Sequence, residues 1–268
     1  AAHDLPPGKS RATLELADGT TILLADGTTN GRLAAGMKMN AEGTLLVDSS
    51  SAVQGATLQP LHLLKVPRGG VFRLSLSDGS TVTVNAGSTL AFPGSFDAGP
   101  RKVFLSGEAY FEVAKDPVRP FIVSSGNTDI TVLGTKFNVN SYEGIYENIT
   151  TVTEGKVSVA SGSTKVVLLP NEAAGVRKTG VIEKYRLDAA QAVAWKNEEF
   201  LFRDAPIDQI MQELERWYDA SIVYEAKPTD HFNLQISRNE RLSKVLKLLE
   251  MTGRVRFEVA EKVITVMK

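Results

Sequence analysis

The residues best suited to chemistry are two glutamates on one expected strand. Glu108 and Glu112 stand four positions apart in the β-rich run Glu108–Val113. Because side chains alternate between the two faces of a strand, both carboxyl groups and Tyr110 would share one face. Two strand carboxylates could serve as the acid and the base of a glycosidase. We expect instead a solvated face, with Ala109, Phe111 and Val113 packing inward.

Other catalytic or metal-binding patterns are weak. Three histidines stand far apart in the sequence: His3, His62 and His231. Three aspartates precede a glycine: Asp18, Asp26 and Asp78. Turn formation explains these aspartates without calcium. Cysteine is absent, and no G-x-S-x-G elbow, P-loop or G-x-G-x-x-G run occurs. We therefore expect no catalytic residue, no cofactor site, no metal site and no enzyme activity.

Aromatic residues near the C-terminal end are the candidates for partner binding. Trp217 and Tyr218 end an expected helix, and Tyr224 lies in the strand expected after it. Tryptophan and tyrosine are enriched at binding hot spots. The domain core is the alternative use of such residues, and we expect it for one of Trp217 and Tyr218. Trp195 is expected to pack at the junction between two modules.

The elements that must position these residues begin with a hairpin at Asp78–Gly79. Val71–Leu76 alternates with period two, and Thr81–Val84 resumes a β-rich run after the turn. Asp-Gly accepts the positive φ angles that a tight turn needs. The same pattern surrounds Asp18–Gly19, sixty residues earlier. We predict a hairpin at each place.

A β-rich block follows, with short strands separated by turn residues up to about residue 185. Strands spaced about 8–12 residues apart are typical of all-β domains. We predict an all-β sandwich or solenoid-like domain over residues 61–190. Residues 1–60 are expected to form an N-terminal extension that carries a β-hairpin and packs on this domain.

Residues 191–268 are predicted to form a small α+β domain from a duplicated β-α-β unit. Two apolar helical stripes match at an offset of 35 residues: Ile207, Ile210, Met211 and Leu214, then Leu242, Val245, Leu246 and Leu249. Such a unit places its helices on one face of a small sheet. We expect Asp204 to cap the first helix, and Ser237 with Glu240 to form a capping box before the second.

Charge and hydropathy argue against nucleic-acid binding and against a membrane-spanning segment within the chain. The 268 residues include 30 Lys+Arg and 31 Asp+Glu, so no basic nucleic-acid footprint exists. The chain has no apolar run of about 18 residues, so we expect no transmembrane helix within it.

A set of motifs stands in a characteristic order between about residues 60 and 185. Within it, Arg101–Val113, read as RKVFLSGEAYFEV, is similar to the most recognisable segment of the FecR family of anti-sigma factors. Further similar segments cover about residues 60–185: Val66–Gly70, Leu76–Ser80, Asn85–Ser88, Lys115–Phe121, Val132–Val139 and Val152–Val157. Residues 191–268 resemble the associated domain of FecR-like proteins from Bacteroidetes-type bacteria. That domain is itself similar to the secretin and TonB short N-terminal domain, here through Ala194–Lys196, Phe200–Phe202 and Trp217–Tyr218.

The resemblance implies the periplasmic sensor region of a single-pass inner-membrane protein. A cytoplasmic anti-sigma segment and one membrane helix would precede residue 1. The chain would receive a signal from the N-terminal signalling domain of a TonB-dependent outer-membrane transporter and regulate transcription through an extracytoplasmic-function sigma factor. The sigma factor would bind only the cytoplasmic segment. No nucleic acid and no direct membrane contact are implied for this chain.

Two other hypotheses remain at this point. A carbohydrate-active or carbohydrate-binding β-domain would use Glu108 and Glu112. A structural module of a secretion machine is suggested by the C-terminal repeat alone.

Overall fold

The computed structural model describes residues 4–25, 31–34, 36–51, 60–96, 99–144 and 146–268. The chain forms two compact units. The larger unit contains Ser10–Pro67 and Val71–Val193, and the smaller unit contains Ala1–Lys9, Arg68–Gly70 and Ala194–Lys268. The fold is mainly β with a small α+β region, as the sequence predicted.

The first sheet of the larger unit has the strand order β2-β1-β6-β9-β10-β12-β13-β16-β17. Its strands are β1 (Lys9–Glu15), β2 (Thr21–Ala25), β6 (Leu61–Val66), β9 (Ser88–Pro93), β10 (Arg101–Ser106), β12 (Phe121–Ser125), β13 (Thr128–Val132), β16 (Val157–Ser161) and β17 (Thr164–Leu168). All these pairs are antiparallel except β10 with β12.

The second sheet has the order β3-β4-β5-β7-β8-β11-β14-β15-β18-β19. Its strands are β3 (Gly31–Ala34), β4 (Met37–Met39), β5 (Leu45–Val47), β7 (Gly70–Ser75), β8 (Thr81–Val84), β11 (Glu108–Glu112), β14 (Lys136–Asn140), β15 (Asn148–Glu154), β18 (Glu172–Val176) and β19 (Ile182–Arg186). A pairing of β1 with β7 joins the two sheets.

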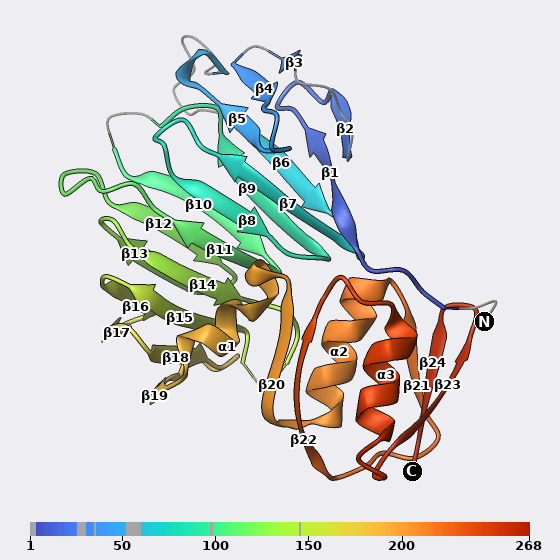
Figure 1. Cartoon of the computed structure of the whole chain (residues 1–268). Helices are drawn as coiled ribbons and strands as arrows, with labels where there is room; N and C mark the ends of the chain where they lie inside the picture. Colours follow the sequence, from blue (N-terminus) through green and yellow to red (C-terminus); the bar gives the residue numbers. More distant parts are fainter. Residues whose placement is uncertain (1–3, 26–30, 35, 52–59, 97–98, 145) are drawn as a thin grey trace. The chain divides into compact units, whose positions relative to one another are not determined.

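One hydrophobic core lies between the two sheets, so the larger unit is a sandwich. Alternate residues are buried in several strands, as for Phe72 and Leu74 on β7 and for Val103 and Leu105 on β10. Colour in Figure 1 passes from blue to yellow along this unit, because strands close in sequence lie close in the stack. The unit also holds η1 (Ser49–Ser51) and ends with α1 (Ala189–Val193).

Both predicted Asp-Gly hairpins are confirmed. The β1–β2 turn contains Gly19 with φ +87°, and the β7–β8 turn contains Gly79 with φ +82°. In each turn an aspartate Oδ1 accepts the N–H of the residue two positions later, at 2.8 Å for Asp18 and 2.9 Å for Asp78. Asp26, the third aspartate before a glycine, lies outside the described residues.

The smaller unit repeats β-α-β, as predicted. After η2 (Ala194–Asn197), its elements are β20 (Glu199–Pro206), α2 (Ile207–Tyr218), β21 (Ser221–Tyr224), β22 (His231–Ser237), α3 (Leu242–Glu250), β23 (Arg256–Ala260) and β24 (Val263–Met267). Both predicted helical stripes are buried. The prediction of one small sheet is wrong, because β20 pairs only with β22 while β21 and β23 flank β24 in a second sheet.

The two predicted helix caps are also wrong. Asp204 lies in β20, where the strand bulges and continues to Pro206, and Pro206 is the N-cap of α2. Ser237 accepts the N–H of Asn239 at 3.1 Å and reaches no amide of α3, because that helix begins only at Leu242. Neither α2 nor α3 is capped by the side chain of its own N-cap residue.

Among the described residues, no helix is both long enough and apolar enough to cross a membrane.

Candidate functional site

Glu108 is a buried structural acceptor. The residue is 7% exposed, and its Oε2 accepts an N–H of Asn85 at 2.7 Å. Its Oε1 accepts N–H groups of Asn138 and Asn140 at 2.9 and 3.2 Å. Tyr110 on the same strand face is buried as well. The prediction of a solvated face is therefore wrong, because neighbouring amides close over the carboxylate, while Phe111 packs in the core as expected.

This arrangement does not favour acid–base catalysis at Glu108 and Glu112. Both oxygens of Glu108 are held by side-chain amides, which orient the carboxylate and connect β11 with β14 and the turn after β8. A general acid must instead reach a bound substrate.

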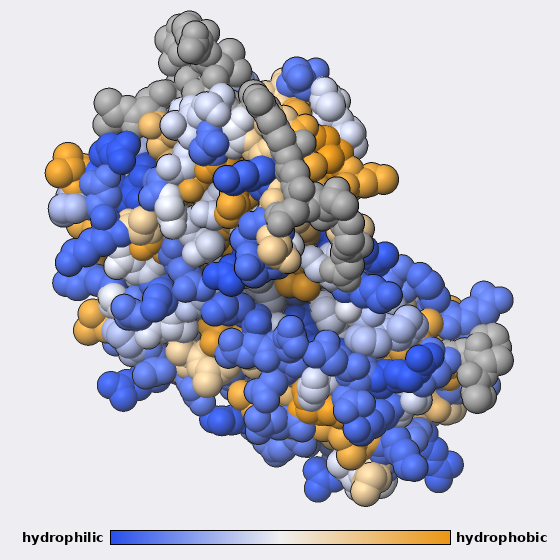
Figure 2. Space-filling model, turned by 45° about the horizontal axis from the view of Figure 1, so that its top comes forward, coloured by the Kyte–Doolittle hydropathy of each residue, from blue (hydrophilic) through white to orange (hydrophobic). Residues whose placement is uncertain are grey.

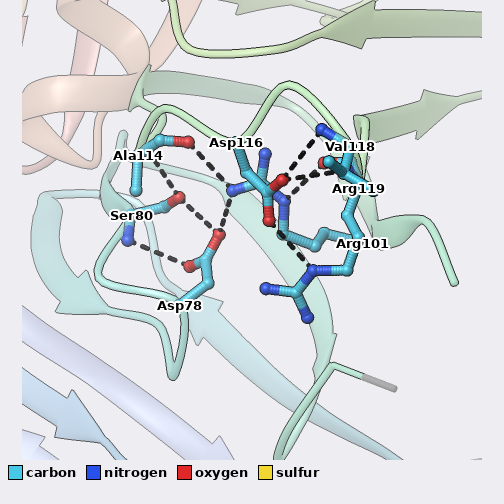
Figure 3. A network of polar contacts seen from close by, with 7 residues as sticks. All are labelled: Asp78, Ser80, Arg101, Ala114, Asp116, Val118 and Arg119. Carbon is cyan, nitrogen blue, oxygen red and sulfur yellow. Dashed lines mark hydrogen bonds and ion pairs between the residues drawn. The ribbon is translucent and has the colours of Figure 1, made fainter. Parts of the chain in front are cut away.

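Arg101 is the centre of a buried network in the segment that carries the FecR resemblance (Figure 3). It is fully buried, and its Nη1 bonds Asp78 Oδ2 at 2.7 Å and the carbonyl of Ala114 at 3.0 Å. Its Nε donates to the carbonyl of Arg119 at 3.0 Å. The guanidinium also lies over the ring of Phe121, 5.5 Å from its centroid.

Ser80 and Asp116 extend this network to the flanking loop. Ser80 Oγ donates to Asp78 at 2.7 Å and accepts the N–H of Ala114 at 3.0 Å. The backbone N–H groups of Arg119 and Val118 donate to Asp116 Oδ1, and these bonds lower the pKa of Asp116 to about 2. The network therefore fixes the β7–β8 turn, the start of β10 and the loop before β12 in one arrangement.

No metal cluster of three or more His, Asp or Glu side chains occurs among the described residues. His62 is buried, and its Nδ1 accepts the N–H of Ala17 at 3.1 Å. Burial lowers the pKa of His62, which Asp18 partly opposes. His231 lies on the surface, with its Nδ1 3.2 Å from Asp204 Oδ1. His3 lies outside the described residues.

Trp217 and Tyr218, two of the predicted partner-binding residues, are both buried in the smaller unit. Trp217 is 5% exposed, and its Nε1 donates to the carbonyl of Arg238 at 2.8 Å. The Arg238 guanidinium lies 3.9 Å from the Trp217 ring centroid and 5.3 Å from that of Phe200. Tyr218 donates its hydroxyl proton to the carbonyl of Glu240 at 2.7 Å. Burial raises the pKa of Tyr218.

Arg238 organises the core of this unit, a role that the sequence analysis missed. It is 3% exposed, and its Nη1 donates to the carbonyl of Trp195 at 3.0 Å. Trp195 is thereby tied to the smaller unit, in which it is itself buried. No local pattern marks Arg238, because its aromatic neighbours come from three separate segments.

Tyr224, the third predicted residue, lies on the outer strand β21 and is 39% exposed. Burial of part of its ring and the carboxylate of Asp208 raise its pKa to about 12, so the phenol stays neutral and able to donate. Lys227 pairs with the same carboxylate at 2.5 Å. The neighbouring Val223 is 48% exposed.

The outer side of β21 is an open sheet edge. The N–H groups of Ser221 and Glu225 donate toward the β24 side, to the carbonyls of Lys262 and Val266. Peptide groups of a parallel strand alternate in direction, so those of Ile222 and Tyr224 face away from β24. Among the described residues, no strand pairs with that side.

Two other edges are blocked by side chains. At the opposite edge of the same sheet, the N–H of Phe257 on β23 donates to Glu250 Oε1 at 2.9 Å. In the larger unit, Lys184 Nζ donates to the carbonyl of Val167 on the edge strand β17, at 2.9 Å. A charged side chain on an edge is a common protection against strand addition.

Surface hydropathy alone does not mark a partner site on the face drawn in Figure 2. Among its coloured residues, most hydrophobic groups are small and separated by hydrophilic ones, and the largest lies at the upper right of the view. A broad apolar patch would be the usual sign of a docking face. The open edge of β21 is therefore the stronger candidate, since its peptide groups can bind a partner without such a patch.

Comparisons with known proteins find a matching family model for each unit. A family model described as FecR protein matches residues 62–158, and one described as FecR, C-terminal matches residues 199–266. A crystal structure of a candidate anti-sigma factor from Parabacteroides distasonis is 32% identical, with a TM-score of 0.71, over 77% of this chain and 98% of that one.

The chain belongs to the FecR family. A second crystal structure of a candidate anti-sigma factor from the same organism covers 78% of this chain and 99% of its own, again at 32% identity and a TM-score of 0.71. A search of curated proteins found no significant match. The FecR match contains the whole Asp78–Arg101 network, and the FecR C-terminal match contains Trp217, Arg238 and the open edge of β21.

Proposed function

We propose that this chain is the periplasmic sensor region of a transmembrane anti-sigma factor. It receives a signal from the N-terminal signalling domain of a TonB-dependent outer-membrane transporter. It relays that signal to an extracytoplasmic-function sigma factor, which binds a cytoplasmic segment outside this chain. Membership of the FecR anti-sigma family supports the regulatory part of this proposal.

The single observation that carries the docking step is the open edge of β21. A partner strand could add there through the outward peptide groups of Ile222 and Tyr224. The neutral Tyr224 hydroxyl and the exposed Val223 side chain would supply contacts on either face of the added strand. The chain acts in this proposal as a binding scaffold without catalytic activity.

The test is binding of the purified transporter signalling domain, measured by calorimetry. Tyr224→Pro removes an N–H that points away from β24, so the sheet of the smaller unit keeps its own hydrogen bonds. The same variant blocks strand addition. We expect at least a ten-fold weaker Kd, which corresponds to about 1.4 kcal/mol.

Val259→Pro is the matched control, because it changes the edge of β23 that Glu250 already blocks. It should bind as the unchanged chain does. Equal Kd values for Tyr224→Pro and the unchanged chain would reject β21 as the docking edge. Absence of binding by the unchanged chain at tens of micromolar would reject the transporter as partner.

A further inference from the structure

Residues 4–9, here called the N-terminal strap, lie in the smaller unit although they are distant from it in sequence. Asp4 supplies the cap that α3 lacks. Its Oδ1 accepts the N–H of Ser243 at 3.0 Å, and its Oδ2 accepts the Ser243 hydroxyl at 2.9 Å. The carbonyl of Leu5 accepts the N–H of Leu242 at 3.1 Å.

Arg241, the residue before α3, also binds Asp4. Its Nε donates to Asp4 Oδ2 at 2.8 Å, and its Nη2 donates to the Asp4 carbonyl at 2.9 Å. The first N–H groups of any helix have no partner within the helix. Two of them in α3 are therefore satisfied by a segment more than 230 positions away.

Gly8 brings the strap onto Trp217. A Cβ atom at this position would lie 2.7 Å from Trp217 Cζ3 and 2.9 Å from the carbonyl of Gly69, so only glycine fits. The next residue, Lys9, donates its N–H to Gly69 at 3.0 Å, and Gly69 donates its own N–H to Arg216 in α2 at 2.7 Å. The strap thus spans from the start of α3 to the end of α2.

The strap is held in a way that permits release. The contacts of Asp4 with α3 are polar and lie at the surface, where the Arg241 side chain is 59% exposed and that of Asp4 is 20% exposed. Such exposed ion pairs contribute little individually. Pro6–Pro7 keep the strap extended when it is free, which reduces the entropy lost on closing.

We infer that the N-terminal strap is a latch that opens and closes on α3 and Trp217, and that docking at β21 is coupled to its opening. The coupling rests on the proposed function, whereas the latch does not. The route between the two is short. Trp217 is followed by Tyr218 and the left-handed C-cap Asp219 (φ +52°), and β21 begins at Ser221.

The latch is tested first in the chain alone, by two variants that act at opposite ends of the strap. Asp4→Ala removes the cap, and Gly8→Ala creates the clash with Trp217. Hydrogen exchange of the Ser243 and Leu242 amides reports on the cap. The indole N–H resonance of Trp217 in NMR spectra, assigned with Trp195→Phe, reports on the other end.

Both variants should raise exchange of the two amides about five-fold, the usual effect of losing one helix cap. Both should also shift the Trp217 resonance, while the later amides of α3 keep their protection. Asp18→Ala and Gly99→Ala are the matched controls: Asp18 caps only its own turn, and a Cβ at Gly99 meets no atom within 4 Å. They should leave both readouts unchanged.

Two results would overturn the latch. Unchanged exchange at Leu242 and Ser243 in Asp4→Ala would show that the strap does not cap α3 in solution. Loss of protection throughout the smaller unit would show that the strap is an integral part of its core.

The coupling is then tested with the transporter signalling domain. If docking opens the strap, thermodynamic linkage couples the two equilibria. A variant whose strap closes less strongly must then bind the signalling domain more tightly, by up to the same factor. Asp4→Ala should therefore bind up to about five-fold more tightly than the unchanged chain. An equal or weaker affinity would reject the coupling and leave the latch standing. Absence of any binding would reject the proposed function and, with it, the coupling.

Discussion

The two units satisfy the hydrogen bonds of their polar groups in different ways. In the larger unit, the buried Asp78–Arg101 pair joins strands of the same unit, and Lys184 protects one of its sheet edges. In the smaller unit, Asp4 caps α3, and Arg68 donates to the carbonyls of Glu215 and Ala220 at the end of α2. In these examples the larger unit satisfies its polar groups within its own strands, whereas the smaller unit uses segments that are distant in the sequence.

This difference indicates that the larger unit is the more rigid one and that the α3 cap of the smaller unit opens more easily. Elements held by few, water-accessible contacts open at a lower free energy than those within a packed core. The smaller unit also has an open edge at β21, while the opposite edge of that three-stranded sheet is blocked by Glu250. The docking proposed at β21 would therefore involve the unit whose helix caps depend on such contacts. Three predictions test this contrast.

The largest expected effect is on the larger unit. Arg101→Met leaves the Asp78 carboxylate buried without its cation, so the free energy of unfolding should fall by about 3–5 kcal/mol. Urea denaturation followed by circular dichroism measures this loss. Adding Asp78→Asn should recover part of it, because no charge then remains buried. A loss below about 1 kcal/mol would mean that the network does not hold the sandwich together.

An intermediate effect is expected in the core of the smaller unit. Arg238→Met removes the cation over Trp217 and leaves the carbonyl of Trp195 without this donor. The free energy of unfolding should fall by about 2–3 kcal/mol, monitored by tryptophan fluorescence. Arg256→Met, at an exposed position of β23, should have almost no effect. If both changes cost the same, the stacked guanidinium does not organise this core.

The smallest effect is the pH dependence of the strap. Burial alone would raise the pKa of Asp4, but hydrogen bonds from Ser243 and Arg241 outweigh it and lower the pKa. The cap is therefore fully present above the ordinary value of 3.8 and is lost as pH falls through the lower folded value. Hydrogen exchange of Ser243, compared between the unchanged chain and Asp4→Asn, should differ at pH 7, and the difference should disappear only when the pH falls below the lowered pKa of Asp4. A constant difference would mean that the carboxylate charge is not what holds the strap.

Local patterns in the sequence predicted much of this architecture. The Asp-Gly turns at Asp18 and Asp78 and the two helical stripes depend on residues within one turn or two of each other. Such short-range preferences are encoded in spacing and residue type. The ordered FecR motifs added the family, which the comparisons support.

The candidate site was only partly predictable. Tyr224 is exposed on the open edge, while Trp217 and Tyr218 are buried, and residue type alone cannot separate these cases. That Tyr224 binds a partner stays a prediction. Glu108 was expected on a solvated face, since the strand pattern does not reveal the amides of Asn138 and Asn140 that cover it.

By itself, the sequence determined the turns, the two repeated helices, the β-rich class and the family. The tertiary structure alone decided which strand edge is open, which aromatic residues are buried and what caps α3. The physical reason is distance along the chain: Asp4 and Ser243 are 239 positions apart, and no local preference links them. Such contacts form only when folding has brought the two segments together.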